Sequence, residues 1–310
     1  MHVTVIGGGL IGASWAALFL AHGHRVCVHD VAPGVEARVR QELQRIQPFM
    51  AQLGLPLDPH SPALSFDGDL AGAVRQADVV QECGPERLAF KQSLWVSVES
   101  HCRPDALLLS SSSGITASMQ SRKMASPQRM LVGHPFNPPH LIPLVEVVPG
   151  RRTSAEATER ARQFYLALGK QAIVLRKEIP GFVANRIQAA VIRESVSLVR
   201  QGVVSVEDLD TAVQSSLGLR WACGGPFLSA HLGGGAGGIG AFFKQFAGGL
   251  QLLWLHMRLR PVLLTGGAQR ALAQQIEQRY GAQSIDQWAS RRDQQQIALL
   301  QALQRPSQSE

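Results

Sequence analysis

A glycine-rich turn close to the start of the sequence constrains the fold more than any other feature. The apolar residues 3–6 lead into the sequence GGGLIG at 7–12, and the small and apolar residues at 10–22 are typical of a helix. The glycines match the G-x-G-x-x-G spacing in the strand, turn and helix context that this motif requires. Such glycines allow a tight turn, close approach of a pyrophosphate and tight packing of a helix on a strand. The alternative is an ordinary glycine-rich surface turn.

The motif defines where a dinucleotide would bind. The start of the helix would face the phosphates with backbone N–H groups and the positive end of its dipole. The residues expected to contact the cofactor are Gly7, Gly9, Leu10, Ile11 and Gly12.

Asp30 ends the second predicted strand, 18 residues after Gly12. An acidic residue at this place accepts hydrogen bonds from the adenosine ribose and repels a 2′-phosphate. Residues 31–34 (VAPG) offer no arginine for such a phosphate. The sequence therefore favours NAD over NADP, with a simple turn role for Asp30 as the alternative.

The first part of the chain alternates short apolar runs with helical patterns, which is typical of a parallel, doubly wound sheet. Several of the runs are almost continuously apolar, as expected for strands covered on both faces. The predicted strands are residues 3–6, 25–30, 79–82, 107–110, 130–134, 144–148 and 172–175.

The pattern changes after Ile179-Pro180-Gly181. From residue 185 onward the spacing of apolar residues is helical, and no strand signal of similar quality follows. We therefore predict a Rossmann-type domain over residues 1–180 and an all-helical domain over residues 181–310.

Composition excludes several classes of protein. Hydrophobic residues make up 45% of the chain and charged residues 17%, so the chain has enough apolar material for packed cores and is not disordered. The net charge is +7, but the basic residues are scattered in short pairs and aromatic residues are only 6%. A nucleic-acid groove would need clustered charge and stacking rings, so we expect none. The charge instead favours small anionic ligands.

The sequence predicts a cytoplasmic protein without a membrane span. It begins directly with a strand pattern, so no signal peptide is expected. Residues 250–264 are apolar, but they are too short and carry too much charge to cross a bilayer. Four well-separated cysteines without a CxxC pattern are typical of reduced thiols. No metal site is expected.

Two further segments follow predicted strands, where ligands bind in such sheets. Glu86 and Lys91 lie just after the strand at 79–82 and are five residues apart. They are candidates for a pair near the nicotinamide, although the spacing alone favours a solvated helix pair. The serine run 110–113, which ends at Ser113, follows another strand and by itself is typical of a turn.

His134 ends a strand and is followed by proline, and Glu146 lies twelve residues further on inside the apolar run 144–148. A carboxylate in such a strand is costly unless it has a partner. A histidine partner would have its tautomer fixed and its protonated form stabilised. From the residues alone, a catalytic pair and a buried structural pair are equally good interpretations.

These segments together resemble the 3-hydroxyacyl-CoA dehydrogenase family. The segments that carry the resemblance are GGGLIG, Asp30, QECGPERLAFK, SSSSG, HPFNPPHLIPLVEVV and PGFVANRIQ, and the similarity extends from residue 1 to about residue 232. The resemblance implies a Rossmann-type domain followed by a helical dimerisation domain. It also implies that His134 is the catalytic base and Glu146 its partner. By the same resemblance Ser113 and Asn185 hydrogen-bond the reacting oxygen, and Glu86 and Lys91 lie near the cofactor.

Within the family, the chain is most similar to the branch that contains L-gulonate 3-dehydrogenase (lambda-crystallin) and carnitine dehydrogenase. Prolines 138, 139 and 143 and the sequence LGLRWA at 217–222 carry this similarity. Arg220 is a candidate for binding a substrate carboxylate, since a guanidinium grips a carboxylate with two hydrogen bonds. A surface or dimer-interface salt bridge is its alternative role. The glycine-rich residues 233–238 depart from the family pattern and indicate an altered substrate pocket.

The resemblance implies that the chain interconverts an L-3-hydroxy acid and its 3-oxo acid, with NAD as hydride acceptor and a homodimer as the assembly. One alternative is a dehydrogenase that acts on the CoA thioester. The alternative from another class is a non-catalytic, crystallin-like NAD-binding protein.

Overall fold

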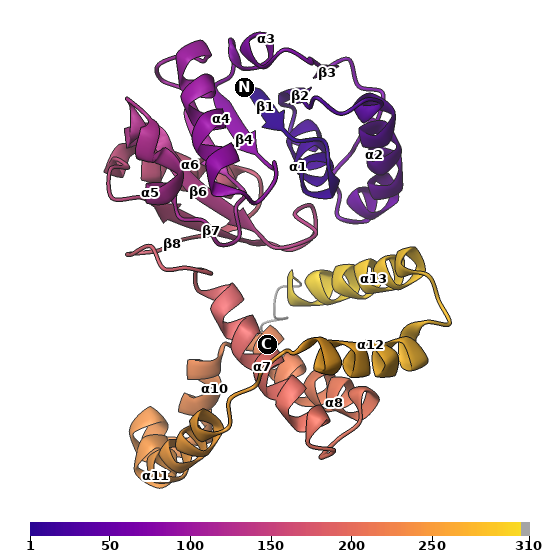
Figure 1. Cartoon of the computed structure of the whole chain (residues 1–310), viewed down its shortest axis with the longest axis vertical. Coiled ribbons are helices and arrows are strands. Elements are labelled where there is room, and N and C mark those ends of the chain that lie inside the picture. Colours follow the sequence, from indigo (N-terminus) through magenta and orange to yellow (C-terminus); the bar gives the residue numbers. More distant parts are fainter. Residues whose placement is uncertain (305–310) are drawn as a thin grey trace, which may run out of the picture. The chain divides into compact units, whose positions relative to one another are not determined.

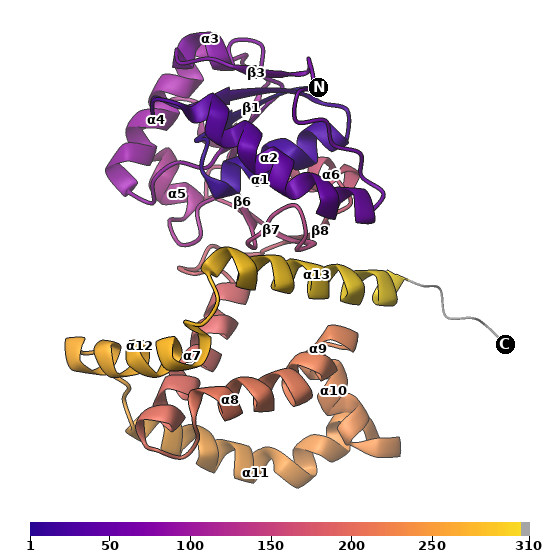
Figure 2. The same cartoon turned by 90° about the vertical axis from the view of Figure 1, so that its right-hand side faces the viewer.

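The computed structural model describes residues 1–304, which form two compact units. Met1–Arg186 together with Asp293–Ala302 makes the first unit, and Ile187–Arg292 makes the body of the second. Figures 1 and 2 show the sheet and its helices in indigo to magenta, and the helices of the second unit in orange and yellow.

The first unit is built on an eight-stranded sheet in the order β3-β2-β1-β4-β5-β6-β7-β8. Its strands are β1 (His2–Ile6), β2 (Arg25–His29), β3 (Leu64–Phe66), β4 (Val79–Glu82), β5 (Leu107–Ser110), β6 (Met130–Pro135), β7 (Leu144–Pro149) and β8 (Gln171–Val174). All neighbouring strands are parallel except β6 and β7, which are antiparallel. The seven predicted strands are confirmed within one residue at each end. The three-residue β3 was not predicted, because so short a segment has no periodicity to detect.

Helices cover both faces of this sheet (Figures 1 and 2). They are α1 (Leu10–Ala21), α2 (Val35–Gln52), α3 (Leu70–Val74), α4 (Leu88–His101), α5 (Ala117–Gln120) and α6 (Ala155–Ala167). Successive strand residues point to opposite faces. Val5 and Leu109 therefore pack with α1, α2 and α6, whereas Ile6 and Leu108 pack with α3, α4 and α5. The doubly wound architecture predicted from the sequence is confirmed.

The described part of the second unit contains helices and no strands. The elements here are α7 (Ala184–Arg200), α8 (Val206–Ala212), the π-helical η3 (Val213–Gly218), α9 (Leu219–Cys223), α10 (Pro226–Gly233), η4 (Gly235–Gly237), α11 (Gly238–Leu259), α12 (Gly266–Tyr280) and α13 (Ile285–Gln304). Residues 305–310 of the predicted helical domain lie outside the described residues. In residues 1–304, no helix is long and apolar enough to cross a membrane.

The end of α13 belongs to the first unit. Ile297 is 1% exposed and packs with Phe49 of α2 and Leu141. The Gln301 side chain donates a hydrogen bond to the carbonyl of Gln52 (2.9 Å).

The loop 136–143 joins β6 to β7 and is held on two sides. The buried Lys170 ammonium donates to the carbonyls of Pro139 and Ile142 (2.9 Å for Ile142) and lies 5.9 Å from the Trp15 ring centre. On α1, the Ser14 hydroxyl accepts the His140 N–H (2.9 Å). Burial lowers the pKa of Lys170 to about 7. The lysine therefore fastens the connection between the two strands that carry His134 and Glu146.

We expect Lys170→Met to lower the free energy of unfolding by about 1–3 kcal/mol, because two buried carbonyls lose their donor. The pKa of Lys170 is lower in the folded chain than its ordinary value of 10.5, so the unfolded chain binds more protons between pH 7 and 10.5. The free energy of unfolding of wild type should therefore increase relative to that of the variant as pH rises above 7. Urea denaturation at pH 7 and pH 9 measures both effects.

The control is Lys123→Met, since Lys123 is exposed. Equal unfolding free energies for Lys170→Met and Lys123→Met would contradict the role given to Lys170.

Candidate active site

The glycine turn between β1 and α1 has the shape that a dinucleotide needs. The backbone of Gly7 is left-handed (φ 102°), and a Cβ there would lie 2.7 Å from the carbonyl oxygen of Cys83. A Cβ at Gly12 would lie 1.8 Å from the Gly7 carbonyl oxygen. At Gly9, by contrast, no protein atom lies within 4 Å of a Cβ position. The turn thus packs tightly on one side and leaves open the side from which a phosphate would approach.

The first turn of α1 supplies donors for that phosphate. The helical hydrogen bonds begin with Ala13 N–H to the Gly9 carbonyl (2.8 Å), so the N–H groups of Leu10, Ile11 and Gly12 precede the helical ladder. A helix N-terminus with such donors binds anions readily. No acidic residue occupies this turn of α1. The predicted cofactor residues therefore fit a pyrophosphate.

Asp30 stands directly after β2, beside the glycine turn. One carboxylate oxygen accepts the Gly8 N–H (2.8 Å) and the other accepts the Ala32 N–H (2.8 Å). These bonds fix the orientation of the carboxylate. A carboxylate has about four acceptor positions, so Asp30 retains capacity for ribose hydroxyls.

A buried ion pair lies at the carboxyl end of β4. The Lys91 ammonium contacts both carboxylate oxygens of Glu82 (2.7 and 2.8 Å) and lies 3.3 Å from Glu86. Lys91 is 1% exposed, so a solvated helix pair is ruled out. The predicted contact between Glu86 and Lys91 exists, but Glu82 is the main partner and was missed. Its signal was a carboxylate at the end of the predicted strand VVQE.

Two neighbouring serines face different partners. The Ser112 hydroxyl donates to the Glu86 carboxylate. Burial by itself would raise the pKa of Glu86, but the bond from Ser112 and the charge of Lys91 outweigh it and lower that pKa. Ser113 is exposed, and its carbonyl accepts a hydrogen bond from the Asn185 side-chain amide (3.0 Å). The structure thus brings Ser113 and Asn185 together, 72 positions apart in the sequence.

His134 and Glu146 are direct partners across the antiparallel pair β6–β7. The Nδ1 atom of His134 lies 2.8 Å from a carboxylate oxygen of Glu146. His134 is 4% exposed, and its ring lies 5.1 Å from that of Phe136 and 5.3 Å from that of Phe182. Because Nδ1 is engaged by the carboxylate, Nε2 is the ring atom that can exchange a proton with a substrate.

The second oxygen of Glu146 holds the start of α7. It accepts the N–H groups of Val183 (2.9 Å) and Ala184 (3.0 Å), and Asn185 comes next in the helix. Burial by itself would raise the pKa of Glu146, but the hydrogen bonds from His134 and from these two N–H groups outweigh it and lower that pKa. A carboxylate at a helix N-terminus is also favoured by the helix dipole. Glu146 is therefore ionised at neutral pH and positions both His134 and Asn185.

Phe182 makes the turn that places Val183 and Ala184 on Glu146. Its backbone is left-handed (φ 49°), which is rare for a bulky residue. Such strain costs roughly 1–3 kcal/mol. The ring is fully buried among apolar side chains and packs against His134, which offsets that cost.

Arg220 and the glycine-rich segment 233–238 lie in the second unit. Arg220 is exposed on the short helix α9, and its substrate role stays a prediction. The glycine-rich segment ends α10 and begins α11, and the Ile239 N–H hydrogen-bonds to His231 Nδ1 (3.1 Å).

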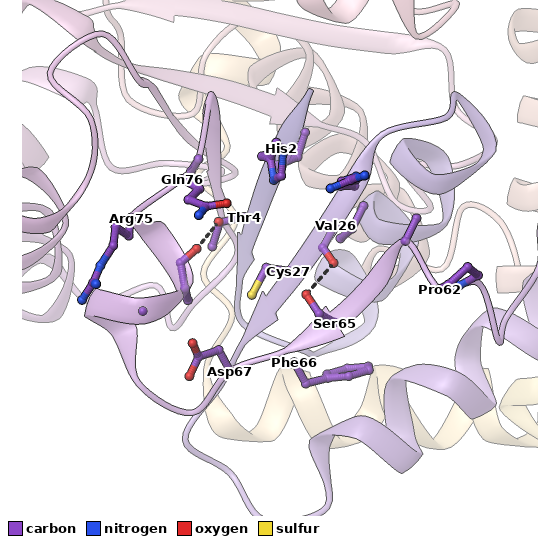
Figure 3. Close-up of a pocket in the computed structure, with 16 residues that line it drawn as sticks. His2, Thr4, Val26, Cys27, Pro62, Ser65, Phe66, Asp67, Arg75 and Gln76 are labelled. Carbon is purple, nitrogen blue, oxygen red and sulfur yellow. Dashed lines mark hydrogen bonds between the residues drawn. The ribbon is translucent and has the colours of Figure 1, made fainter.

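A cavity of about 780 Å³ opens on the face of β1, β2 and β3 (Figure 3). His2 and Arg25, which begin β1 and β2, line it together with Cys27 and Ser65. Gly7, Asp30 and Glu82 stand at or after the opposite, carboxyl ends of their strands. This cavity is therefore separate from the candidate active site. Within residues 1–304, no cluster of three or more His, Cys, Asp or Glu residues could hold a metal ion.

Two family models match the chain, one after the other. The NAD-binding domain of 3-hydroxyacyl-CoA dehydrogenase matches residues 2–179, and the C-terminal domain of the same enzyme matches residues 181–259. The chain belongs to the 3-hydroxyacyl-CoA dehydrogenase family. The resemblance drawn from the sequence motifs is confirmed.

Curated relatives and solved structures agree with this membership. A 3-hydroxyacyl-CoA dehydrogenase of Gibberella moniliformis is 40% identical over 97% of this chain and 93% of the relative. An L-carnitine dehydrogenase of Pseudomonas aeruginosa is 40% identical over the same shares. The structure of 5-formyl-3-hydroxy-2-methylpyridine 4-carboxylic acid 5-dehydrogenase, described as an NAD+-dependent dismutase, is 26% identical with a TM-score of 0.83 and covers 99% of each chain. As a member of this dehydrogenase family, the chain is an NAD-dependent oxidoreductase.

Glu146→Gln tests the electrostatic part of this geometry. The pKa of Glu146 is lower in the folded chain than its ordinary value of 4.5, so its ionisation stabilises the fold above pH 4.5 and that contribution is lost as pH falls through the folded value. We expect wild type to lose free energy of unfolding between pH 6 and 3 relative to the glutamine variant, which does not titrate. Urea midpoints across this range measure the loss.

The control is Glu36→Gln on α2, where the carboxylate is 56% exposed in a surface pair. If wild type and Glu146→Gln showed the same acid profile, the carboxylate would have no such role.

Proposed function

We propose that the chain catalyses the reversible oxidation of a free L-3-hydroxy acid to the 3-oxo acid, with NAD as hydride acceptor and His134 as general base. The observation that carries the proposal is that both carboxylate oxygens of Glu146 form hydrogen bonds. One oxygen binds His134 Nδ1, and the other binds the N–H groups that precede Asn185. A base and an oxygen-binding amide are thereby fixed by one carboxylate.

The proposed mechanism assigns one task to each side chain. His134 Nε2 takes the proton of the substrate hydroxyl, and the ionised Glu146 stabilises the imidazolium that results. Ser113 and the second N–H of the Asn185 amide hydrogen-bond the reacting oxygen and stabilise its developing charge. When bound at the glycine turn, NAD would supply the acceptor for the C3 hydride. Removal of the hydroxyl proton and of the C3 hydride converts the 3-hydroxy acid into the 3-oxo acid.

The binding assignments rest on the same geometry. We propose that Gly7, Gly9, Leu10, Ile11 and Gly12 bind the NAD pyrophosphate. Asp30 would bind the adenosine ribose, and the Glu82–Lys91–Glu86 cluster would support the nicotinamide half. Residues 1–180 would bind NAD, and residues 181–310 would complete the substrate site.

The substrate class is proposed from the relatives. L-Carnitine is a free 3-hydroxy acid, and an L-carnitine dehydrogenase is 40% identical over nearly the whole chain. The second candidate is a CoA thioester, which the Gibberella relative's name supports. Residues 233–238 and Arg220 are the proposed determinants of this choice.

We also propose a cytoplasmic homodimer. The second unit exposes large apolar side chains, including Trp254 (61%), Phe227 (80%) and Leu252 (71%), which a second copy would bury. The four cysteines are free thiols, as expected in a reducing compartment. Sedimentation equilibrium that returned the mass of one 33.5 kDa chain would refute the dimer.

His134→Gln removes the proposed base while retaining a side chain of similar size. We expect kcat to fall by about 10²–10⁴-fold, the usual contribution of a positioned general base, with unchanged affinity for NAD. Steady-state kinetics and NADH fluorescence titration measure the two quantities. His101→Gln, an exposed change on α4, is the matched control. Near-normal turnover of His134→Gln would remove the histidine from the mechanism.

A substrate panel decides between the candidates. NADH formation is followed with L-carnitine, L-gulonate and 3-hydroxybutyrate beside 3-hydroxybutyryl-CoA. We expect a free acid to give the highest kcat/KM, and Arg220→Gln to raise its KM at least tenfold. Preference for the thioester would replace the proposed substrate class. NAD binding without turnover of any compound would favour the non-catalytic alternative.

A further inference from the structure

A second cavity of the first unit, about 710 Å³ in volume, is lined by positive charge. Its walls come from α5 and the turn η1 (Ser121–Lys123), from the turn after β7, and from the segment after β8. Four cationic side chains line it: Arg122, Arg151, Arg176 and Lys177. They come from three segments that are far apart in the sequence.

All four of these cations are exposed. In the part of the chain that the structure describes, none of the four side chains makes an ion pair or a hydrogen bond. Elsewhere on the same unit, Arg103 and Arg162 form ion pairs at 2.8 and 2.9 Å. The carboxylate on the cavity wall, that of Glu178, accepts the Ser118 N–H (2.8 Å). With Glu178 counted, the concave surface still carries a net positive charge.

Hydrogen bonds between the three segments hold the walls in place. Besides the bond from Ser118 N–H to Glu178, the Arg151 N–H donates to the Ser118 hydroxyl (2.8 Å). A Cβ at Gly150 would lie 2.9 Å from the Ser118 nitrogen, so these two backbones approach closely. The backbone segments that carry the four exposed cations are thus held in place, so these segments need no ordering when a ligand binds.

We propose that this cavity binds a small molecule that carries a chain of two or more phosphates. A guanidinium fork matches two phosphate oxygens at once, and three of the four cations are arginines. Four cations against the one carboxylate of Glu178 suit a di- or triphosphate better than a single carboxylate. The volume lies within the usual range of small-ligand pockets, roughly 300–1,000 Å³, and exceeds what one phosphate fills. No aromatic ring is among the described residues that line it, which disfavours single-stranded nucleic acid.

The cavity is separate from the NAD site and from the dyad. None of the described residues that line the cavity belongs to the glycine turn, to the Glu82–Lys91–Glu86 cluster or to the dyad. Glu146 and Pro149 are three residues apart on β7, which corresponds to roughly 10 Å along the strand. A ligand in the cavity would therefore leave the NAD site accessible.

The test uses the purified full chain saturated with NAD+, so that the pyrophosphate site of the glycine turn is filled. Sodium tripolyphosphate is titrated by isothermal calorimetry at constant ionic strength, with orthophosphate in a parallel titration. We expect one tripolyphosphate per chain and at least tenfold weaker binding of orthophosphate. No binding of tripolyphosphate, or equal affinity for the two anions, would overturn the proposal.

Paired variants assign the binding to this cavity. The double variant Arg151→Gln/Arg176→Gln should weaken tripolyphosphate binding at least tenfold, while NAD affinity stays unchanged as the measure of correct folding. Arg103→Gln/Arg162→Gln makes the same change in net charge on exposed arginines outside the cavity, and should leave binding unchanged. Equal weakening in the two double variants would show general electrostatic attraction and would refute a site here.

Discussion

The carboxylate of Glu146 is fully buried, and the candidate active site depends on how that charge is satisfied. An isolated buried carboxylate costs several kcal/mol because it loses its hydration. Here the donors are the His134 ring and two backbone N–H groups at the start of α7. The electrostatic requirement of one side chain therefore brings a strand, a ring and a helix terminus together.

The antiparallel pairing of β6 and β7 makes this arrangement local. Parallel neighbours need a long crossover, whereas antiparallel strands can be joined by a short loop. His134 and Glu146 therefore face each other across the pair, and only the loop 136–143 and the strand ends separate them in the sequence. That loop in turn is fixed by Lys170 and Ser14, so its hydrogen bonds support the geometry of the pair.

The sequence predicts this site unevenly, for physical reasons. The partner of His134 could be predicted, because an apolar strand cannot hold Glu146 without one. The main partner of Lys91 could not be predicted, because Glu86 is nearer to it in the sequence. Only the burial of α4 in the fold brings the Lys91 ammonium to Glu82. The serine run consists of identical residues, so the sequence does not show which of them faces Glu86. The structure shows that Ser112 makes this contact. The same limit hid β3, whose three residues are too few to show a period.

Asn185 belongs to the unit that contains the sheet, although it lies on the first long helix of the helical half. Its amide is bonded to the Ser113 carbonyl, and the residues just before it are bonded to Glu146. The division between the two units falls after Arg186. The Asn185 amide, the His134 ring and the Glu146 carboxylate thus all belong to the first unit. The distances among these three side chains are therefore set by the packing of one unit.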